Sequence, residues 1–119
     1  MTTDAHAFAV KWRDACNSRD LDRITALYSE DVVFKSPRVR TVSGEPSATL
    51  TGKDAVRDYW RKILERRPDL RFEIGQVFVG ADSIALEYRV GDLHGIEFMT
   101  LDGNSLISFA VGNDAVEPF

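Results

Sequence analysis

The sequence contains a single cysteine, Cys16, only two histidines, His6 and His94, and no long run of apolar residues. One cysteine cannot form an internal disulfide, which fits a reducing compartment, so we expect a cytoplasmic protein. One cysteine and two distant histidines do not form a metal-ligand cluster, so no metal site is predicted. No apolar stretch approaches the roughly 20 residues of a membrane-spanning helix, and no membrane association is expected.

Other motifs are absent as well. The first residues, MTTDAHAFAVKWRD, lack a basic segment followed by an apolar block, so we expect no secretory signal. Neither a phosphate-binding glycine motif nor the G-x-S-x-G context of a serine hydrolase is found, and no cofactor is predicted. The net charge of −4 disfavours nucleic acid as a partner.

What the chain does contain is typical of a folded globule. Its 119 residues suffice for one core, and no repeat or linker divides them, so 1–119 is predicted to be one domain. The hydrophobic fraction of 44% and charged fraction of 29% exclude a disordered tail. The polar, turn-rich stretch 41–52 is interpreted as a loop or rim hairpin and not as a domain boundary.

Apolar side chains recur at helical spacing in three early segments. The first helix is expected over 3–17, with Thr3 as its N-cap, and the second follows Asp20. The third is expected to run from near Gly52 to Pro68, which ends it. Its charged residues alternate in sign, which favours a solvated, ion-paired face over a basic patch. The apolar faces comprise Ala5, Phe8, Ala9, Trp12, Ala15 and Cys16; Leu21, Ile24, Leu27 and Tyr28; and Val56, Tyr59, Trp60, Ile63 and Leu64.

Strand patterns follow the helices. From Leu70 onward the apolar period becomes two, and an earlier strand at 32–34 ends at Pro37. Helices followed by antiparallel strands form an α+β order. We therefore predict a cone-shaped α+β barrel, in which three N-terminal helices pack on a curved, mostly antiparallel mixed sheet. The later strands are expected near 72–78, 84–90, 93–101 and 106–111.

Three segments carry a resemblance to a known family: RDLDRITALYSEDVVFKSP, TGKDAVRDYWRKILERRPDLRFEIGQVFVGADSIALEYRV and the hairpin around FMTLDGNSLISF. Over nearly the whole chain they resemble the nuclear transport factor 2-like superfamily, specifically its SnoaL-like group. The resemblance implies a cone with a deep apolar pocket. It implies no single reaction, because the group includes isomerases, cyclases, epoxide hydrolases, dehydratases and members without a known activity.

The ketosteroid isomerases of this superfamily use a carboxylate base and two proton donors that form an oxyanion hole. Matched by position, the base falls on Ser36, the tyrosine donor on Trp12 and the carboxylic acid donor on Glu97. A neutral serine cannot remove a carbon-bound proton unaided, and an indole N–H is a weaker acid than a phenol. The resemblance therefore argues against ketosteroid isomerisation by that mechanism.

Glu97 is the predicted catalytic acid or base. In the 93–101 strand it shares a face with Leu93, Gly95, Met99 and Leu101. If this face lines the pocket, burial raises the carboxyl pKa and makes Glu97 a proton donor. If the face points outward, Glu97 is solvated or ion-paired with a dimer partner. We favour the pocket, with Ser36 supplying a polar group at the base position.

The predicted substrate-binding residues are Trp12, Tyr28, Trp60, Met99 and His94. Tyr28 could point its hydroxyl into the pocket, but we favour a side chain packed on the core with its tip at the rim. His94 lies on the strand face opposite Glu97. Cyclases of the group use a histidine and an aspartate on neighbouring strands, yet we favour a hydrogen-bonded histidine beside a turn.

A homodimer through the open sheet face is predicted. Apolar stripes occur in both 84–90 and 72–78, and one cone cannot bury both faces of its sheet, so a second subunit is expected to cover the open face.

The C-terminal AVGNDAVEPF replaces an aromatic pair common in SnoaL-like chains, so either the pocket wall is thinner or the tail folds back with Phe119. Arg38 and Arg40 either meet an anionic ligand at the mouth or are solvated on a strand edge.

Two functions fit these patterns. The first is a cofactor-independent isomerase, cyclase or hydrolase that binds a small, mostly apolar molecule and uses Glu97 as acid or base. The second is a non-catalytic ligand-binding or structural dimeric module.

Overall fold

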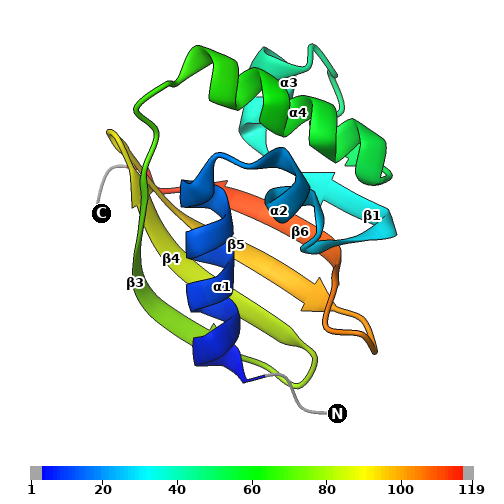
Figure 1. The fold of residues 1–119 in the computed structure, drawn as a ribbon, viewed down its shortest axis with the longest axis vertical. Helices are drawn as coiled ribbons and strands as arrows, with labels where there is room; N and C mark the ends of the chain where they lie inside the picture. Colours follow the sequence, from blue (N-terminus) through cyan, green and yellow to red (C-terminus); the bar gives the residue numbers. More distant parts are fainter. Residues whose placement is uncertain (1–3, 117–119) are drawn as a thin grey trace.

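A curved six-stranded sheet forms one layer of the computed structural model, which describes residues 4–116. Its strand order is β2-β1-β6-β5-β4-β3, in which β1 and β6 pair in parallel and the other neighbours are antiparallel. The sheet is therefore mixed and mostly antiparallel, as predicted (Figure 1). The strands are β1 Tyr28–Lys35, β2 Thr49–Thr51, β3 Phe72–Val79, β4 Ser83–Val90, β5 Leu93–Leu101 and β6 Ile107–Asp114.

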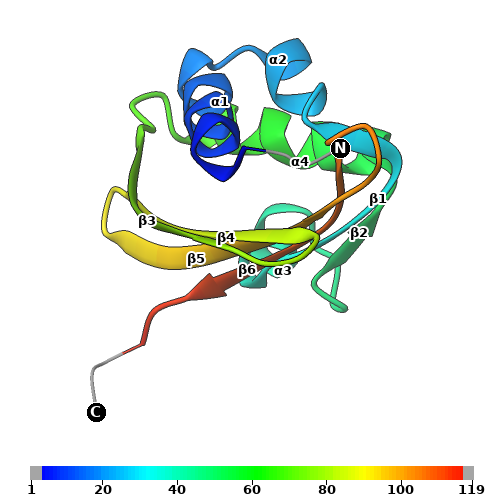
Figure 2. The ribbon, with the colours of Figure 1, turned by 90° about the horizontal axis from the view of Figure 1, so that it is seen from below.

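Helices cover the concave side of this sheet, and Figure 2 shows the sheet curling beneath α1 and α2. The helices are α1 Ala5–Ser18, α2 Leu21–Thr25, α3 Pro37–Val42 and α4 Lys53–Arg66. Asp20 caps α2 as predicted, because its carboxylate accepts hydrogen bonds from the backbone N–H groups of Asp22 and Arg23. The α1 cap is Asp4, and the predicted cap, Thr3, lies outside the described residues. Within residues 4–116, no helix is long and apolar enough to cross a membrane.

Two local predictions were wrong. The chain after Pro37 is not extended but forms the helix α3. Proline suits the first helical position, and Ser36 caps the helix because its hydroxyl oxygen accepts a hydrogen bond from the Arg38 backbone N–H. Tyr28 is not on a helix face but begins β1. The backbone N–H of Ile107 donates to the carbonyl of Leu27, so pairing with the last strand ends the helical segment. The stretch 41–52 contains the end of α3 and the rim strand β2.

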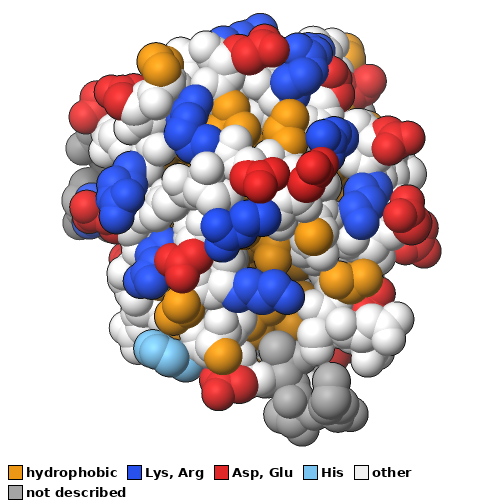
Figure 3. Space-filling model, in the orientation of Figure 1, with side chains coloured by type: hydrophobic (Ala, Val, Ile, Leu, Met, Phe, Trp, Pro, Cys, Tyr) orange, Lys and Arg blue, Asp and Glu red, His pale blue; other side chains and the backbone are white. Residues whose placement is uncertain are grey.

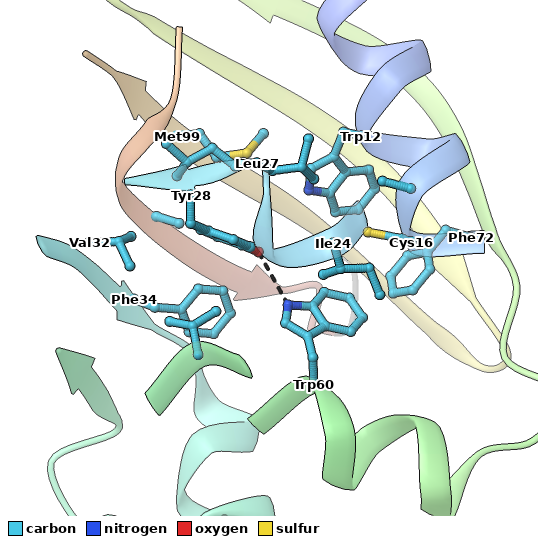
Figure 4. Packing of buried hydrophobic residues seen from close by; sticks show 14 of the residues in the cluster. Trp12, Cys16, Ile24, Leu27, Tyr28, Val32, Phe34, Trp60, Phe72 and Met99 are labelled. Atoms are coloured by element: carbon cyan, nitrogen blue, oxygen red, sulfur yellow. Dashed lines mark hydrogen bonds between the residues drawn. The ribbon is translucent and has the colours of Figure 1, made fainter. Parts of the chain in front are cut away.

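The core lies between the inner sheet face and the helices. Trp12 contacts Phe72 edge-on, with ring centroids 5.3 Å apart, and Phe72 lies 5.9 Å from the Trp60 ring. These rings pack in one buried cluster (Figure 4), where Cys16 is fully buried. Burial raises the pKa of the Cys16 thiol, so at neutral pH it is an inert small hydrophobe.

The outward face of α4 is ion-paired, as predicted. Arg61 pairs with Asp58 at 2.6 Å and with Glu65 at 2.9 Å, and Lys62 pairs with Asp58 at 3.1 Å. Figure 3 shows Lys or Arg and Asp or Glu side chains intermixed over this side of the molecule. Such exposed pairs add little stability, and they leave no basic stripe along this helix face.

The two predicted stripes of the sheet required correction. The stripe Ile84, Leu86, Tyr88 and Val90 is buried against the helices, and Phe72 of the other stripe is buried with it. A register shift between Ile74 and Val77 turns Phe78 to the opposite face, where it is 49% exposed. The apolar row on the convex side, hereafter the outer-face row, is formed by register neighbours on four strands: Phe78, Ala85, Phe98 and Val111.

Candidate functional site

A cavity of about 250 Å³ lies between α4 and the inner face of the sheet. Its exposed lining residues, Thr41, Arg66 and Arg67, come from α3 and the C-terminal end of α4 and mark the mouth. The lining residues Trp12 and Glu97, each of which has a buried polar atom without a hydrogen-bond partner, are called the floor of the cavity here. The other buried lining residues are mostly aromatic and include Phe34, Tyr59, Trp60, Phe72 and Tyr88.

Glu97 is the acidic group of this floor. The alternation of β5 turns Gly95, Glu97 and Met99 inward and leaves Ile96 and Phe98 exposed, which is the favoured one of the two orientations considered from sequence. Burial raises the pKa of the Glu97 carboxyl to about 8; Arg38 opposes this shift and Asp114 adds to it. The group is therefore mostly protonated at neutral pH and can donate a hydrogen bond.

A glycine provides the space for this carboxyl group. Gly112 on β6 faces Glu97 in register. A Cβ atom at Gly112 would lie 3.3 Å from Glu97 Oε1 and 3.3 Å from Ser36 Oγ. The small residues of the C-terminal strand thus leave room for two polar side chains. The alternative, a tail folded back with Phe119, falls outside the described residues.

Ser36 is buried beside Glu97, but its hydroxyl oxygen already has partners. It accepts from the Arg38 backbone N–H at 3.4 Å, and its hydrogen bond to Tyr59 helps to lower the pKa of that phenol. Burial outweighs these contacts, so the pKa of Tyr59 is raised overall. Ser36 is therefore a neutral helix-capping residue, and no carboxylate stands at this position.

Trp12 supplies the second polar group of the floor. Its indole is 1% exposed and Nε1 has no hydrogen-bond partner. Within residues 4–116, Trp12 Nε1 and Glu97 Oε1 are the buried side-chain polar atoms without a partner. Buried polar atoms are nearly always paired, because an unmade hydrogen bond costs about 1–3 kcal/mol. Two lining residues of one cavity thus each carry a buried, unpaired polar atom, which makes them the first candidates for contact with a polar atom of a ligand.

Arg38 spans the polar side of the cavity from α3. Its guanidinium donates to Asp114 Oδ1 at 2.7 Å and to the Tyr88 hydroxyl at 3.0 Å. Burial raises the pKa of Tyr88, which therefore stays protonated at neutral pH. The charge of Arg38 is balanced by Asp114, and the pair holds the ends of β4 and β6 against α3.

The other predicted substrate-binding residues differ in where they lie. Trp60 lines the cavity, but its Nε1 donates to the Tyr28 hydroxyl at 3.2 Å inside the core (Figure 4). Tyr28 is 1% exposed, so its tip reaches neither the rim nor the cavity, and the favoured rim position was wrong. Met99 is fully buried and is not a lining residue. His94 faces away from the cavity and pairs with Glu87 at 2.9 Å, the hydrogen-bonded arrangement that we favoured.

Sequence reasoning missed several lining residues. Tyr59 and Tyr88 were interpreted only as apolar core positions, and Arg66 and Arg67 as part of a solvated face. For Arg38, the sequence left open a place at the mouth or on a strand edge, and the residue lies on α3 and lines the cavity. The serine-proline start of α3 is the signal that could have placed it, because it fixes Arg38 in the first turn of a helix.

The chemistry available to this site is hydrogen bonding and proton transfer. Within the described part of the chain, no group of three or more His, Cys, Asp or Glu side chains is placed to hold a metal ion. Glu97 is the one carboxyl group among the cavity-lining residues. A neutral acid and an indole N–H, surrounded by aromatic rings, suit an apolar molecule with one hydrogen-bond-accepting oxygen.

Comparison with known proteins gives the family. The profile of the SnoaL-like domain matches residues 9–113. A SnoaL-like protein of unknown function from Burkholderia thailandensis is 34% identical, with 94% of each chain covered and a TM-score of 0.89. A proposed ketosteroid isomerase from Kribbella flavida is 25% identical over 97% of this chain and 82% of that one, with a TM-score of 0.67.

More distant similarities add the fold and one short match. A proposed isomerase of the SnoaL-like family from Agrobacterium tumefaciens is 16% identical over 94% of this chain and 97% of that one, with a TM-score of 0.76. A DNA ligase from Syntrophotalea carbinolica is 39% identical over 51 residues, which are 43% of this chain and 8% of the ligase, so the match is to a segment of that enzyme. From the profile match and the Burkholderia relative, the chain belongs to the SnoaL-like domain family, with the nuclear transport factor 2-like cone fold.

Proposed function

We propose that this protein binds a small, mostly apolar molecule through an oxygen atom of that molecule, and that it is a cofactor-independent enzyme with Glu97 as its acid or base. One observation carries the proposal. The Glu97 carboxyl group and the Trp12 N–H are both buried, both unpaired and both at the floor of the same aromatic cavity.

The two groups act on the same oxygen. A protonated Glu97 and the Trp12 N–H each donate a hydrogen bond to a carbonyl or epoxide oxygen, which stabilises negative charge as it develops there. Glu97 then transfers its proton to that oxygen, and the carboxylate that remains recovers a proton from the product or from water. A carboxyl pKa of about 8 suits both steps near neutral pH. Acid-initiated isomerisation, cyclisation and epoxide hydrolysis begin with such a proton transfer.

A second candidate is a binding module without catalysis. It is favoured by Ser36, whose oxygen caps α3 at the position where ketosteroid isomerases carry a base. Glu97 has no second carboxyl group among the described cavity-lining residues to share acid and base roles. Under this alternative, Glu97 and Trp12 bind the ligand oxygen and transfer no proton.

The Glu97 pKa and the Glu97→Gln variant separate the two. Carbon-detected NMR titration of the carboxyl group should give a pKa near the value of about 8. A value near that of a free glutamate would contradict the acid role. In a turnover screen of small carbonyl and epoxide compounds, Glu97→Gln should abolish activity if Glu97 transfers a proton. Glu87→Gln, on the convex face, is the matched control. Retained binding without turnover in the native protein favours the module.

We further propose a homodimer that forms through the outer-face row. Phe78 and Phe98 are 49% and 38% exposed, and Ile96 beside them is 41% exposed. Large apolar side chains adjacent on one sheet face are typical of an interface. These residues lie on neighbouring, hydrogen-bonded strands and therefore form one rigid surface. In a dimer with a twofold axis, this surface of one subunit would pack against the same surface of the other. A cytoplasmic location stays a prediction from the single cysteine.

A further inference from the structure

The mouth of the cavity differs in charge from the rest of the molecule. We propose that the ligand is a small apolar carboxylate whose anionic group lies between Arg66 and Arg67 at the mouth, while an oxygen at its other end reaches the floor. The proposal rests on the function proposed above and adds the class of substrate.

The two arginines reach across the mouth in different directions. Arg67 Nη2 lies 2.8 Å from the position that a Cβ atom of Gly91 would occupy, so this guanidinium extends from α4 to the turn between β4 and β5. Arg66 Nη1 lies 3.5 Å from the Thr41 carbonyl oxygen, so this side chain extends toward α3. Both residues line the cavity, and together they flank its opening.

Neither of these charges is balanced by a described carboxylate. Arg38, the third arginine of the cavity, pairs with Asp114, and Arg61 on the outer face of α4 pairs with Asp58 and Glu65. No ion pair within residues 4–116 includes Arg66 or Arg67. The mouth therefore carries two positive side chains without an ion-pair partner among the described residues, although the chain has a net charge of −4.

The floor adds no opposing charge. Glu97 is the one acidic lining residue, and its burial keeps it mostly neutral at neutral pH. The cavity as a whole is thus electropositive, and its low-dielectric aromatic walls strengthen the attraction for an anion at the mouth. Guanidinium groups form paired hydrogen bonds with carboxylates and with phosphates, and we assign the smaller, singly charged carboxylate to this pair of arginines.

The size of the cavity limits the apolar part of the ligand. An apolar cavity of about 150 Å³ holds benzene. The cavity here, about 250 Å³, therefore has room for one ring with a short substituent or for an aliphatic body of equal size. A four-ring skeleton is too large for the enclosed space. The ligand class is accordingly a single-ring or similarly small carboxylate with a carbonyl or ether oxygen at the far end.

A matched pair of probes tests the charge. 4-Acetylbenzoate has a ring, a ketone oxygen and a carboxylate, and 4-acetylbenzamide is its neutral counterpart. Both tryptophans of the chain, Trp12 and Trp60, line the cavity, so binding can be followed by their fluorescence and by calorimetry. The benzoate should bind more tightly than the amide, and its advantage should shrink with added salt.

Variants assign the preference to the two arginines. Each of Arg66→Met and Arg67→Met should weaken benzoate binding by up to about fivefold, and the double variant by about tenfold, without changing amide binding. Arg61→Met, which removes an ion-paired arginine from the outer face of the same helix, should change neither affinity. Equal binding of the two probes, no effect of the double variant, or no binding of either probe would overturn the proposal.

A third probe separates this proposal from the function on which it rests. Benzoate lacks the ketone, so the ratio of its affinity to that of 4-acetylbenzoate reports on the floor alone. Trp12→Phe and Glu97→Leu should remove the advantage of the ketone while the preference for carboxylate over amide remains. If the arginine variants act as expected and these two do not, the carboxylate class stands and the proposed role of the floor fails.

Discussion

Glu97 on β5 and Gly112 on β6 face each other in register, and the carboxyl group of the first occupies the space left by the missing side chain of the second. The same space admits the Ser36 hydroxyl from the start of α3. The position of the Glu97 carboxyl group thus depends on the absence of a side chain at Gly112.

Gly112→Ala should disturb this floor. The added methyl group would lie 3.3 Å from Glu97 Oε1 and 3.3 Å from Ser36 Oγ, so both side chains must give way by a few tenths of an ångström. Overpacking of this kind costs about 1–3 kcal/mol, and we expect the free energy of unfolding in urea to fall by about 1 kcal/mol or more. Displacement toward the cavity should also increase the solvation of the carboxyl group and lower the Glu97 pKa.

Gly103→Ala is the matched control. A Cβ atom at Gly103 meets nothing within 4 Å, and its backbone does not have a positive φ angle. This variant should be within about 0.5 kcal/mol of the native protein and leave the Glu97 pKa unchanged. Equal stability and equal Glu97 titration in both variants would show that the space at Gly112 is not limiting.

The raised pKa of Glu97 predicts a pH-dependent stability. Below the pKa of an unfolded glutamate the group is protonated in both states and does not oppose folding. Between that value and about 8, the unfolded chain releases the proton and the folded one retains it, so stability falls as pH rises and levels off above about 8. The total loss should be on the order of a few kcal/mol.

Glu97→Gln isolates this effect. Urea unfolding at several pH values between about 5 and about 8.5 should show the native protein losing stability relative to Glu97→Gln as pH rises. The outer-face variant Glu87→Gln should show the same dependence of stability on pH as the native protein. Hydrogen bonds from His94 and from the Gln76 backbone N–H lower the pKa of Glu87, so this carboxyl group stays ionised over the whole pH range of the experiment. Parallel curves for native protein and Glu97→Gln would mean that the Glu97 pKa is not raised.

Arg38 and Asp114 should shift the Glu97 pKa in opposite directions. The Arg38 charge holds this pKa down, so Arg38→Met should raise it further. Asp114 raises the Glu97 pKa and also holds the Arg38 guanidinium at 2.7 Å, so Asp114→Asn should lower the pKa. NMR titration of the Glu97 carboxyl carbon measures both. A shift of the same sign in the two variants would show that rearrangement of the pair dominates over its charges.

The features that followed from sequence are those set by local patterns. The cap of α2 and the apolar faces of α1 and α4 depend on residues a few positions apart. The alternation along 93–101 put Glu97 on one face with Gly95 and Met99, the face that the structure turns inward. The order of helices and strands then restricted the fold to an α+β layer arrangement.

What sequence could not supply depends on distant pairing. Tyr28 follows a helical pattern, but parallel pairing of β1 with β6, about 80 residues away, makes it a strand residue. Gly112 meets Glu97 through sheet register, and Arg38 meets Asp114 and Tyr88 because α3 packs beside β4 and β6. No local period signals such contacts. A bulge in β3 likewise reversed the face of Phe78.

The proposed dimer is tested at the centre of the outer-face row. Phe98→Glu places a charge where Phe98 neighbours Ala85 and Val111 in register, and burial of that charge against a second subunit would be costly. We expect the variant to sediment as a monomer at a concentration at which the native protein is a dimer. Val79→Glu is the control, because Val79 is 70% exposed at the end of β3 and pairs with inward-facing Ile84, off the row. A native monomer at micromolar concentration, or equal dissociation of both variants, would contradict an interface on this face.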